Sequence, residues 1–199
     1  MRPNEFPTGA TVVFDEQSAW TRRRVLQTAG AGFALWLSRL VFPSIASARA
    51  LPEGRLNLYN LHTDERLSVT YRTDTGTYDQ EALNDLNYLL RCHHTNESMM
   101  MDVQVIEFMN LVQKRVGRSR ELLIVSGYRS PAYNEELIRR GTKAVRNSYH
   151  VLGQAVDLQI PGVPLRMVRD AAMRLGCGGV GYYPRGRFVH LDSGPFRYW

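Results

Sequence analysis

The chain has 199 residues and a formal charge of +6 at pH 7, with 44% apolar and 22% charged residues. This length suits one domain, or one domain with a targeting segment, and the composition excludes a globally disordered chain. Two cysteines exclude a disulfide-dense scaffold and a zinc finger built on four cysteines, and no apolar run reaches the length that crosses a bilayer with ease.

The positive charge is concentrated near the N-terminus. Residues 1–50 hold six Arg and three Asp or Glu, so 19 of the 25 basic and 16 of the 19 acidic residues lie in residues 51–199, a net charge of +3. This small excess comes without a basic run interleaved with aromatic residues. We therefore expect no nucleic-acid partner.

Residues 1–50 have the parts of an export signal. Three arginines at 22–24 precede an uncharged stretch from Val25 to Ser38, and the alanines at 46, 48 and 50 give two A-x-A cleavage sites, after Ala48 or Ala50. Consecutive arginines are typical of the twin-arginine signal, which predicts export to the periplasm with the twin-arginine translocase as partner. The alternatives are a buried helix and an uncleaved anchor. We expect no stable membrane span after processing, because the apolar core is short.

The first half of the remaining chain predicts a hairpin and two helices. Two runs of alternating apolar residues predict an antiparallel β-hairpin within 51–78. Asp79 is placed to begin a helix over 80–91, and Asp102 to begin a second helix over 103–116.

The second half alternates further strands and helices, with most strands late in the chain. Strands are expected over 121–126, 155–160, 178–183 and 187–191, and helices over 131–140 and from Pro164 to near Gly176. This order favours an α+β domain over regular βαβ winding. Export would place Cys92 and Cys177 in an oxidising compartment, where they could pair or remain buried and unpaired.

Two histidines and an aspartate predict a metal site. His150 precedes Asp157 by seven residues, and His190 lies in a late strand. Asp157 interrupts an apolar strand, where a carboxylate needs a hydrogen-bond, ionic or metal partner; Arg129 is an alternative partner. Two imidazoles and a carboxylate with one open position are typical of catalytic zinc, which lowers the pKa of a bound water toward about 7.

The chain resembles the zinc D-alanyl-D-alanine metallopeptidase superfamily, which also includes lysostaphin-type enzymes and the hedgehog domain. The resemblance rests on SGYRSP at 126–131, the S-x-H-x-x-G-x-A-x-D segment at 148–157, and FVH at 188–190. Together with the leader, GGVGYYP and the ending FVHLDSGPFRYW, it is most similar to the MepK-like (YcbK-like) murein endopeptidases. It covers about residues 55–199 and implies a small α+β domain with an antiparallel sheet under helices.

The resemblance also implies roles for individual residues. His150, Asp157 and His190 match the zinc ligands. Arg129 matches the arginine that faces the substrate and the developing oxyanion, and Ser148 matches a substrate-contacting serine. The neighbouring Tyr128 is expected to be structural.

The sequence departs from the superfamily pattern at one place. Many members carry a Glu or Asp general base a few residues before the third histidine, whereas residues 187–189 here are Arg, Phe and Val. Asp192 follows His190 by two residues and shares its strand face. We expect Asp192 to be catalytic, either as the base or by orienting His190.

The remaining motifs predict no second site. His62, His93 and His94 are expected to be structural or surface residues. The three methionines at 99–101 are more typical of gap-filling side chains than of a soft-metal site. The glycines at 178–181 lack the strand–loop–helix context of a nucleotide site.

These observations predict a zinc peptidase domain over 51–199, behind the export signal. The expected function is hydrolysis of peptide cross-links between peptidoglycan stem peptides during cell-wall remodelling. Two alternatives stay open: a D,D-carboxypeptidase that trims stem peptides, and a non-catalytic zinc-containing module that binds the cell wall.

Overall fold

The computed structural model describes residues 52–117 and 120–199, so the predicted export signal lies outside the described residues. Its strands are β1 (Gly54–Asn60), β2 (Arg66–Arg72), β3 (Leu122–Ser126), β4 (Ala155–Gln159), β5 (Gly179–Tyr183), β6 (Phe188–Asp192) and β7 (Arg197–Tyr198). Its helices are α1 (Gln80–Leu89), α2 (Val103–Gly117), α3 (Pro131–Arg139) and α4 (Leu165–Leu175). No helix of the described part has the length and apolar character needed to cross a membrane.

The strands form one mixed sheet in the order β2-β1-β3-β4-β6-β5-β7. Neighbouring strands are antiparallel except for β1–β3 and β5–β7, which are parallel. The predicted α+β class is confirmed, but the sheet is not antiparallel throughout. The reason is connectivity: α1 and α2 lie between β1 and β3 in the chain, and a long crossover of this kind is what a parallel pair requires.

Capping residues explain why the helices begin and end where predicted. The Asp79 carboxylate accepts hydrogen bonds from the backbone at the start of α1, and the Ser130 hydroxyl does so for α3, which has Pro131 at its first position. Gly176 ends α4 in the left-handed conformation with φ of 66°.

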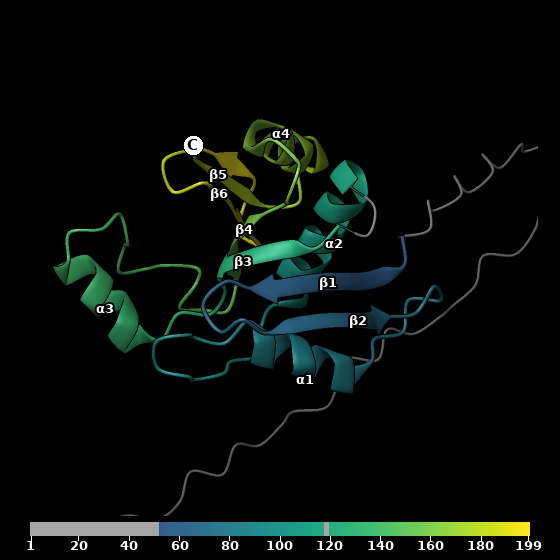
Figure 1. Cartoon of the computed structure of the whole chain (residues 1–199), viewed down its shortest axis with the longest axis horizontal. Helices are drawn as coiled ribbons and strands as arrows, with labels where there is room; N and C mark the ends of the chain where they lie inside the picture. The colour runs from purple at the N-terminus through teal and green to yellow at the C-terminus, as the bar shows by residue number, and fades with distance from the viewer. Residues whose placement is uncertain (1–51, 118–119) are drawn as a thin grey trace, which may run out of the picture. The chain divides into compact units, whose positions relative to one another are not determined.

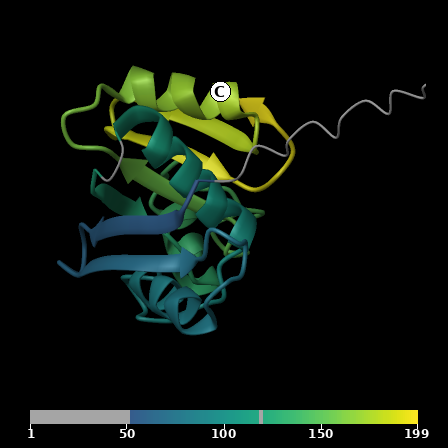
Figure 2. The same ribbon diagram turned by 90° about the vertical axis from the view of Figure 1, so that its right-hand side faces the viewer.

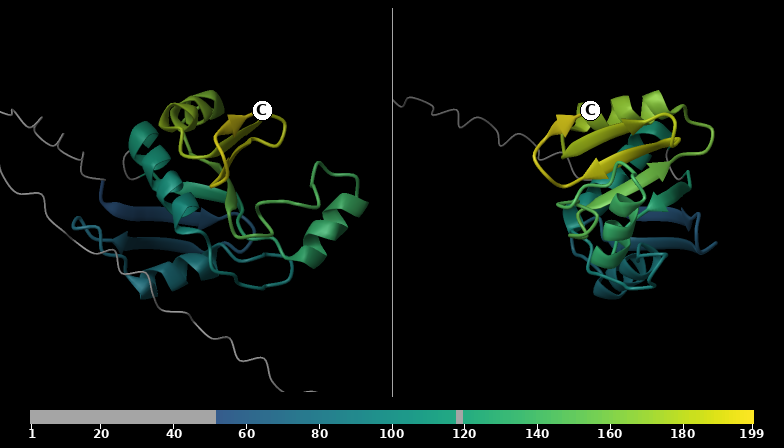
Figure 3. Two further views of the ribbon diagram at one scale, coloured as in Figure 1. Left: turned by 180° about the vertical axis from the view of Figure 1, so that it is seen from behind. Right: turned by 90° about the vertical axis from the view of Figure 1, so that its left-hand side faces the viewer.

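Helices cover one face of the sheet. Figure 2 shows α2 lying across the strands beside α4, and these two helices contact each other as well as β6. Helix α1 packs against β2, whereas α3 stands away from the sheet (Figures 1 and 3). The apolar face of α2 supplies much of the core, through Val105, Ile106, Phe108, Met109 and Val112.

Alternation along the central strands places polar residues opposite this core. Val156 and Leu158 of β4 belong to the apolar core, while Asp157 between them points to the other face. In β6, Val189 and Leu191 flank His190 in the same way. The strand pattern therefore presents a carboxylate and an imidazole side by side on the face that α2 and α4 leave free.

The two cysteines are not paired. Cys92 is buried and Cys177 is exposed, and both are free thiols. The cysteines are therefore unpaired, and only Cys92 is also buried as the second alternative expected.

Candidate active site

Three segments bring the predicted metal ligands together. Asp157 of β4 and His190 of β6 are direct cross-strand partners. His150 lies in the loop between α3 and β4, and its carbonyl accepts a hydrogen bond from Gly153 at 3.3 Å. Gly153 has φ of +68°, and a Cβ there would lie 2.8 Å from the Met100 carbonyl oxygen, so only glycine fits this turn.

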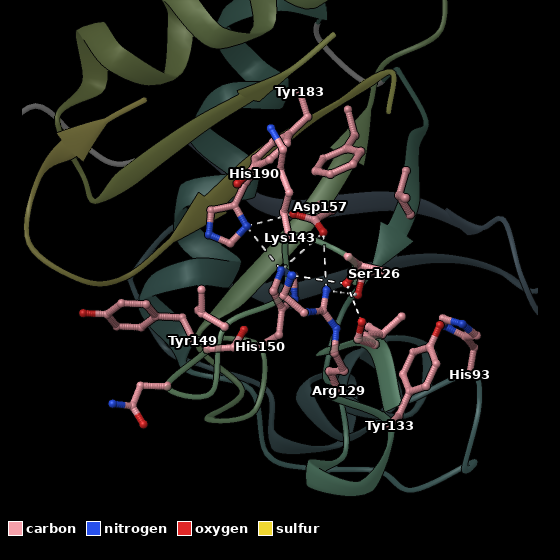
Figure 4. A pocket seen from close by; sticks show the side chains of 18 of the residues that line it. His93, Ser126, Arg129, Tyr133, Lys143, Tyr149, His150, Asp157, Tyr183 and His190 are labelled. Atoms are coloured by element: carbon pink, nitrogen blue, oxygen red, sulfur yellow. Dashed lines mark hydrogen bonds and ion pairs between the residues drawn. The ribbon is translucent and has the colours of Figure 1, made fainter. Parts of the chain in front are cut away.

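The three side chains point at one another (Figure 4). Nδ1 of His190 is 2.8 Å from Oδ1 of Asp157, and Nε2 of His150 is 3.3 Å from Oδ2 of Asp157. The two inner imidazole nitrogens are 3.2 Å apart. Within residues 52–117 and 120–199, this is the one group of three such side chains placed to share a metal ion.

An acceptor outside the cluster holds each imidazole. Nδ1 of His150 is 2.8 Å from the Gly127 carbonyl oxygen, and Nε2 of His190 is 3.1 Å from Oδ2 of Asp192. Carbonyl and ionised carboxylate oxygens only accept, so each outer nitrogen donates. In the neutral imidazoles, the inner nitrogens then carry lone pairs directed at the cluster.

The cluster needs a positive charge at its centre, because two lone pairs and a carboxylate converge there. Burial lowers the pKa of His150. Burial also disfavours the charged form of His190, but hydrogen bonds to Asp157 and Asp192 outweigh it and raise the pKa of His190. The two imidazoles likewise overcome burial and hold the pKa of Asp157 below its usual range. A proton or a metal cation satisfies this arrangement.

The donor set fits a divalent transition metal. Two imidazole nitrogens and one carboxylate oxygen all lie within 4.8 Å of one another, and such a set suits zinc and similar ions. The outer hydrogen bonds to a carbonyl and a carboxylate are the usual supports of metal-binding histidines. Three protein ligands leave a position open, as in catalytic sites.

Arg129 is a buried cation beside the cluster. Its side chain is 12% exposed, and Nη2 lies 3.8 Å from Oδ2 of Asp157. Its other contacts are long, at 3.4 Å to both Asn134 Oδ1 and Ser126 Oγ, and its Nε has no hydrogen-bond partner among the described residues. Burial lowers the pKa of Arg129, against the effect of Asp157. The guanidinium therefore keeps donors free for a further group.

The cluster opens into a pocket of about 610 Å³, which is also lined by Arg129 and Ser148. Ser148 is 7% exposed and lies two residues before His150. The structure thus brings all the predicted ligands, Arg129 and Ser148 to one place. Tyr128 instead packs within the apolar core.

Comparison with known proteins agrees with this geometry. Residues 48–199 match the family model described as peptidoglycan L,D-endopeptidase MepK. The chain belongs to this family. It is 38% identical over 178 residues to peptidoglycan L,D-endopeptidase MepK of Escherichia coli K12, covering 89% of this chain and 96% of that protein. It is 37% identical over 171 residues to the probable peptidoglycan L,D-endopeptidase MepK of Haemophilus influenzae, covering 84% and 90%.

In this MepK family member, Asp192 lies behind His190 rather than in the pocket. Its Oδ2 accepts from the outer nitrogen of His190, while Arg197 donates to both carboxylate oxygens at 3.0 and 2.7 Å. Asp192 is fully buried, and Asp157 is the sole carboxylate among the described residues that line the pocket. The geometry of Asp192 is that of a residue that orients His190.

Several pocket residues were not predicted from the sequence. His62 and His93 line the pocket with their rings stacked at 3.8 Å, although both were expected to be structural or surface residues. Tyr149, Tyr183 and Trp199 also line it. Tyr149 directly precedes His150, so its place beside the site has a sequence signal, whereas tertiary packing alone brings His62, His93 and Tyr183 to the pocket.

The glycines of β5 make room for Asp192 and for the Trp199 ring. A Cβ on Gly179 would collide with the Asp192 carboxylate, and one on Gly181 would lie 2.9 Å from the Trp199 ring. Gly179 and Gly181 therefore allow Asp192 and Trp199 to pack closely behind and beside His190.

Proposed function

We propose that this chain is an exported zinc metallopeptidase that hydrolyses peptide cross-links of peptidoglycan. The observation that carries the proposal is the His150–Asp157–His190 cluster, open to a pocket that also holds Arg129. Membership of a family described as peptidoglycan L,D-endopeptidases supports the substrate class.

The proposed metal is zinc, held by His150, Asp157 and His190. Bound in such a site, zinc acts as a Lewis acid and lowers the pKa of water. The chain's own contribution is to fix the inner nitrogens: the Gly127 carbonyl orients one imidazole and Asp192 orients the other. Asp157 remains ionised between them because its pKa is lowered.

Arg129 and Ser148 are proposed to handle the substrate. A fixed cation with free donors stabilises the negative charge that develops on the carbonyl oxygen of the scissile peptide bond. Arg129 suits this role because it is buried, permanently charged and aimed at the cluster (Figure 4). Ser148 lines the same pocket and is placed to contact the peptide.

Asp192 is proposed to act as a positioning residue, not as the general base. Its two oxygens are engaged by His190, Arg197 and the backbone of Gly194 at 2.7 to 3.1 Å. A general base must reach the proton that it removes, directly or through one water. A carboxylate enclosed behind the metal ligand does not meet that requirement.

The site is proposed to work in the cell envelope, after export by the twin-arginine route. Residues 22–24 and the A-x-A segments support this location. The names of the relatives favour an endopeptidase over a D,D-carboxypeptidase, and the free donors of Arg129 favour an enzyme over a module that only binds.

A product analysis tests the proposal. The purified chain, loaded with zinc, is incubated with muropeptides that are cross-linked through L,D bonds, cross-linked through D,D bonds, or not cross-linked, and the products are identified by mass spectrometry. We expect L,D-linked dimers to yield monomers, and His150→Ala to abolish this. Release of terminal D-alanine alone would establish the carboxypeptidase, and no turnover by the zinc-loaded chain would leave only the binding module.

A further inference from the structure

A chain of hydrogen bonds runs from the partly exposed Arg197 of β7 to the metal centre. Arg197 of β7 donates to both oxygens of Asp192, at 3.0 and 2.7 Å. Asp192 in turn accepts from Nε2 of His190, whose Nδ1 faces Asp157. Only the Asp192 carboxylate therefore separates Arg197 from the imidazole of His190.

Aromatic rings hold the Arg197 guanidinium in place. Its central carbon lies 4.9 Å from the ring centre of Tyr149 and 5.0 Å from that of Trp199. Tyr149 directly precedes His150, and the Trp199 ring centre is 5.5 Å from that of His190. The guanidinium thus contacts the neighbour of one histidine ligand and supports the other through Asp192.

The environment of Asp192 makes this contact more than a surface ion pair. Exposed ion pairs contribute little, but the Asp192 side chain is 0% exposed, against 38% for Arg197. Without Arg197, the buried carboxylate loses its only arginine partner among the described residues.

We infer that Arg197 is a positioning residue of the metal centre, which acts through Asp192 to hold His190 with its inner nitrogen free for the ion; this rests on the proposed zinc site. The two hydrogen bonds from the guanidinium fix the orientation of the Asp192 carboxylate. The carboxylate accepts in turn from Nε2 of His190, which fixes the tautomer and the orientation of that ring. Arg197 and Trp199 therefore belong to the surroundings of the metal centre, although neither is a ligand.

The test is a zinc titration of the full chain by competition with a chromogenic chelator. We expect Arg197→Met to weaken zinc binding roughly tenfold to a hundredfold, the range typical of partners that support metal-binding histidines. Arg197→Lys keeps the charge without the planar pair of donor groups, so its zinc affinity should lie between those of the wild type and Arg197→Met. Arg185→Met, on the exposed turn between β5 and β6, is the matched control and should bind as the wild type does.

A double-mutant cycle separates positioning from general stabilisation. Asp192→Asn alone should also weaken zinc binding, and Arg197→Met should cost little more in that background, since its effect runs through the carboxylate. Nitrogen-15 NMR of the histidines should show a protonated His190 Nε2 in the wild type and a loss of this single tautomer in Arg197→Met. Thermal melts in the presence of chelator establish that each variant is folded.

The outcomes distinguish this inference from the proposed function. A wild-type chain that binds no zinc overturns the proposed metal site, and the inference with it. Wild-type affinity in folded Arg197→Met, or fully additive losses in the cycle, overturns the inference alone. If Arg197→Met does not fold, Arg197→Lys decides, and wild-type affinity together with an unchanged His190 tautomer in that variant overturns the inference.

Discussion

Asp157 shows how one residue's environment can specify a metal site. A buried carboxylate flanked by core residues costs free energy unless its charge is compensated. Here two imidazoles and a guanidinium surround it, at 2.8, 3.3 and 3.8 Å. Since outer acceptors hold both imidazoles, a central cation would compensate the carboxylate and accept both inner lone pairs.

The first prediction concerns the ligands. The wild type should bind about one zinc ion per chain, and His150→Ala and His190→Ala should each lose it, because two remaining ligands bind too weakly. Metal analysis of the purified variants measures this. His94→Ala is the control, since His94 is exposed and paired with Glu136 at 3.0 Å. Full zinc retention in both ligand variants would exclude this ligand set.

The second prediction concerns Arg129. Arg129→Ala should retain zinc and fold, but lose roughly a hundredfold to a thousandfold in kcat, the usual cost of removing one oxyanion-stabilising donor. Steady-state kinetics on an L,D-linked muropeptide measure it. Arg146→Ala, which removes an exposed arginine paired with Glu135, should leave the rate unchanged. Wild-type kcat in folded Arg129→Ala would contradict the role.

At the scale of elements, β5 brings the C-terminal aromatic residue onto the site. Gly181 is the cross-strand partner of His190, and the absence of a side chain there lets Trp199 lie against the strand. The indole Nε1 donates to the Tyr183 hydroxyl at 2.8 Å, so two aromatic residues of the pocket wall depend on this one position.

The third prediction tests that packing. Gly181→Ala would place a methyl group 2.7 Å from the Tyr183 ring and 2.9 Å from the Trp199 ring. We expect a loss of about 1–3 kcal/mol in the free energy of unfolding, as for other overpacked sites, measured by urea denaturation. In combination with Trp199→Ala the loss should be smaller than the sum of the two single losses. Strictly additive losses would mean that a methyl group at position 181 does not clash with the Trp199 ring.

Local patterns were sufficient to predict most elements, because caps and alternation act within a few residues. Asp79 and Ser130 accept hydrogen bonds from backbone N–H groups at the start of a helix, and Gly176 ends a helix in the left-handed conformation. The parallel pairing of β1 with β3 could not be predicted in this way, since strand partners are chosen by tertiary packing. Strand β7 has two residues, too few for any period to be visible.

In the candidate site, too, local chemistry could be predicted from the sequence and tertiary contacts could not. The ligands were predictable because a carboxylate in an apolar strand and a histidine seven residues away are chemically unusual. The location of His93 in the pocket wall was not predictable, because its neighbours His62 and Tyr133 are 31 and 40 residues away in the chain. The connection from Arg197 to His190 needs coordinates, since a five-residue spacing from Asp192 implies no contact.

At the scale of the whole molecule, His93 links stability to pH. Burial, together with the nearby His62, His94 and Arg129, lowers the pKa of His93 to about 4. The unfolded chain protonates this residue near pH 6.5. Between these two values the unfolded state binds the proton more strongly, so stability falls as the pH falls.

The fourth prediction follows from this loss of stability at lower pH. The free energy of unfolding of the wild type should decrease more steeply between about pH 6.5 and pH 5 than that of His93→Gln, which has no imidazole to protonate. Urea denaturation with chelator present measures both, so zinc linkage is absent. His93→Gln loses the stacking on His62 and should be the less stable at pH 7, with the difference narrowing in acid. Parallel pH dependences would contradict the lowered pKa.

The last prediction concerns delivery of the whole chain to its substrate. A peptidoglycan enzyme must leave the cytoplasm, and the proposed route depends on the arginines at 22 and 23, ahead of a weakly apolar stretch. Replacing both with Lys keeps the charge but should block export, so the chain should accumulate in the cytoplasm at its unprocessed mass. Cell fractionation with mass spectrometry measures location and processing together. Arg49→Lys, between the two proposed cleavage positions, is the control for charge-conserving change. Normal periplasmic accumulation of the double variant would exclude the twin-arginine route, and an exported chain that keeps residues 1–50 would establish the uncleaved anchor instead.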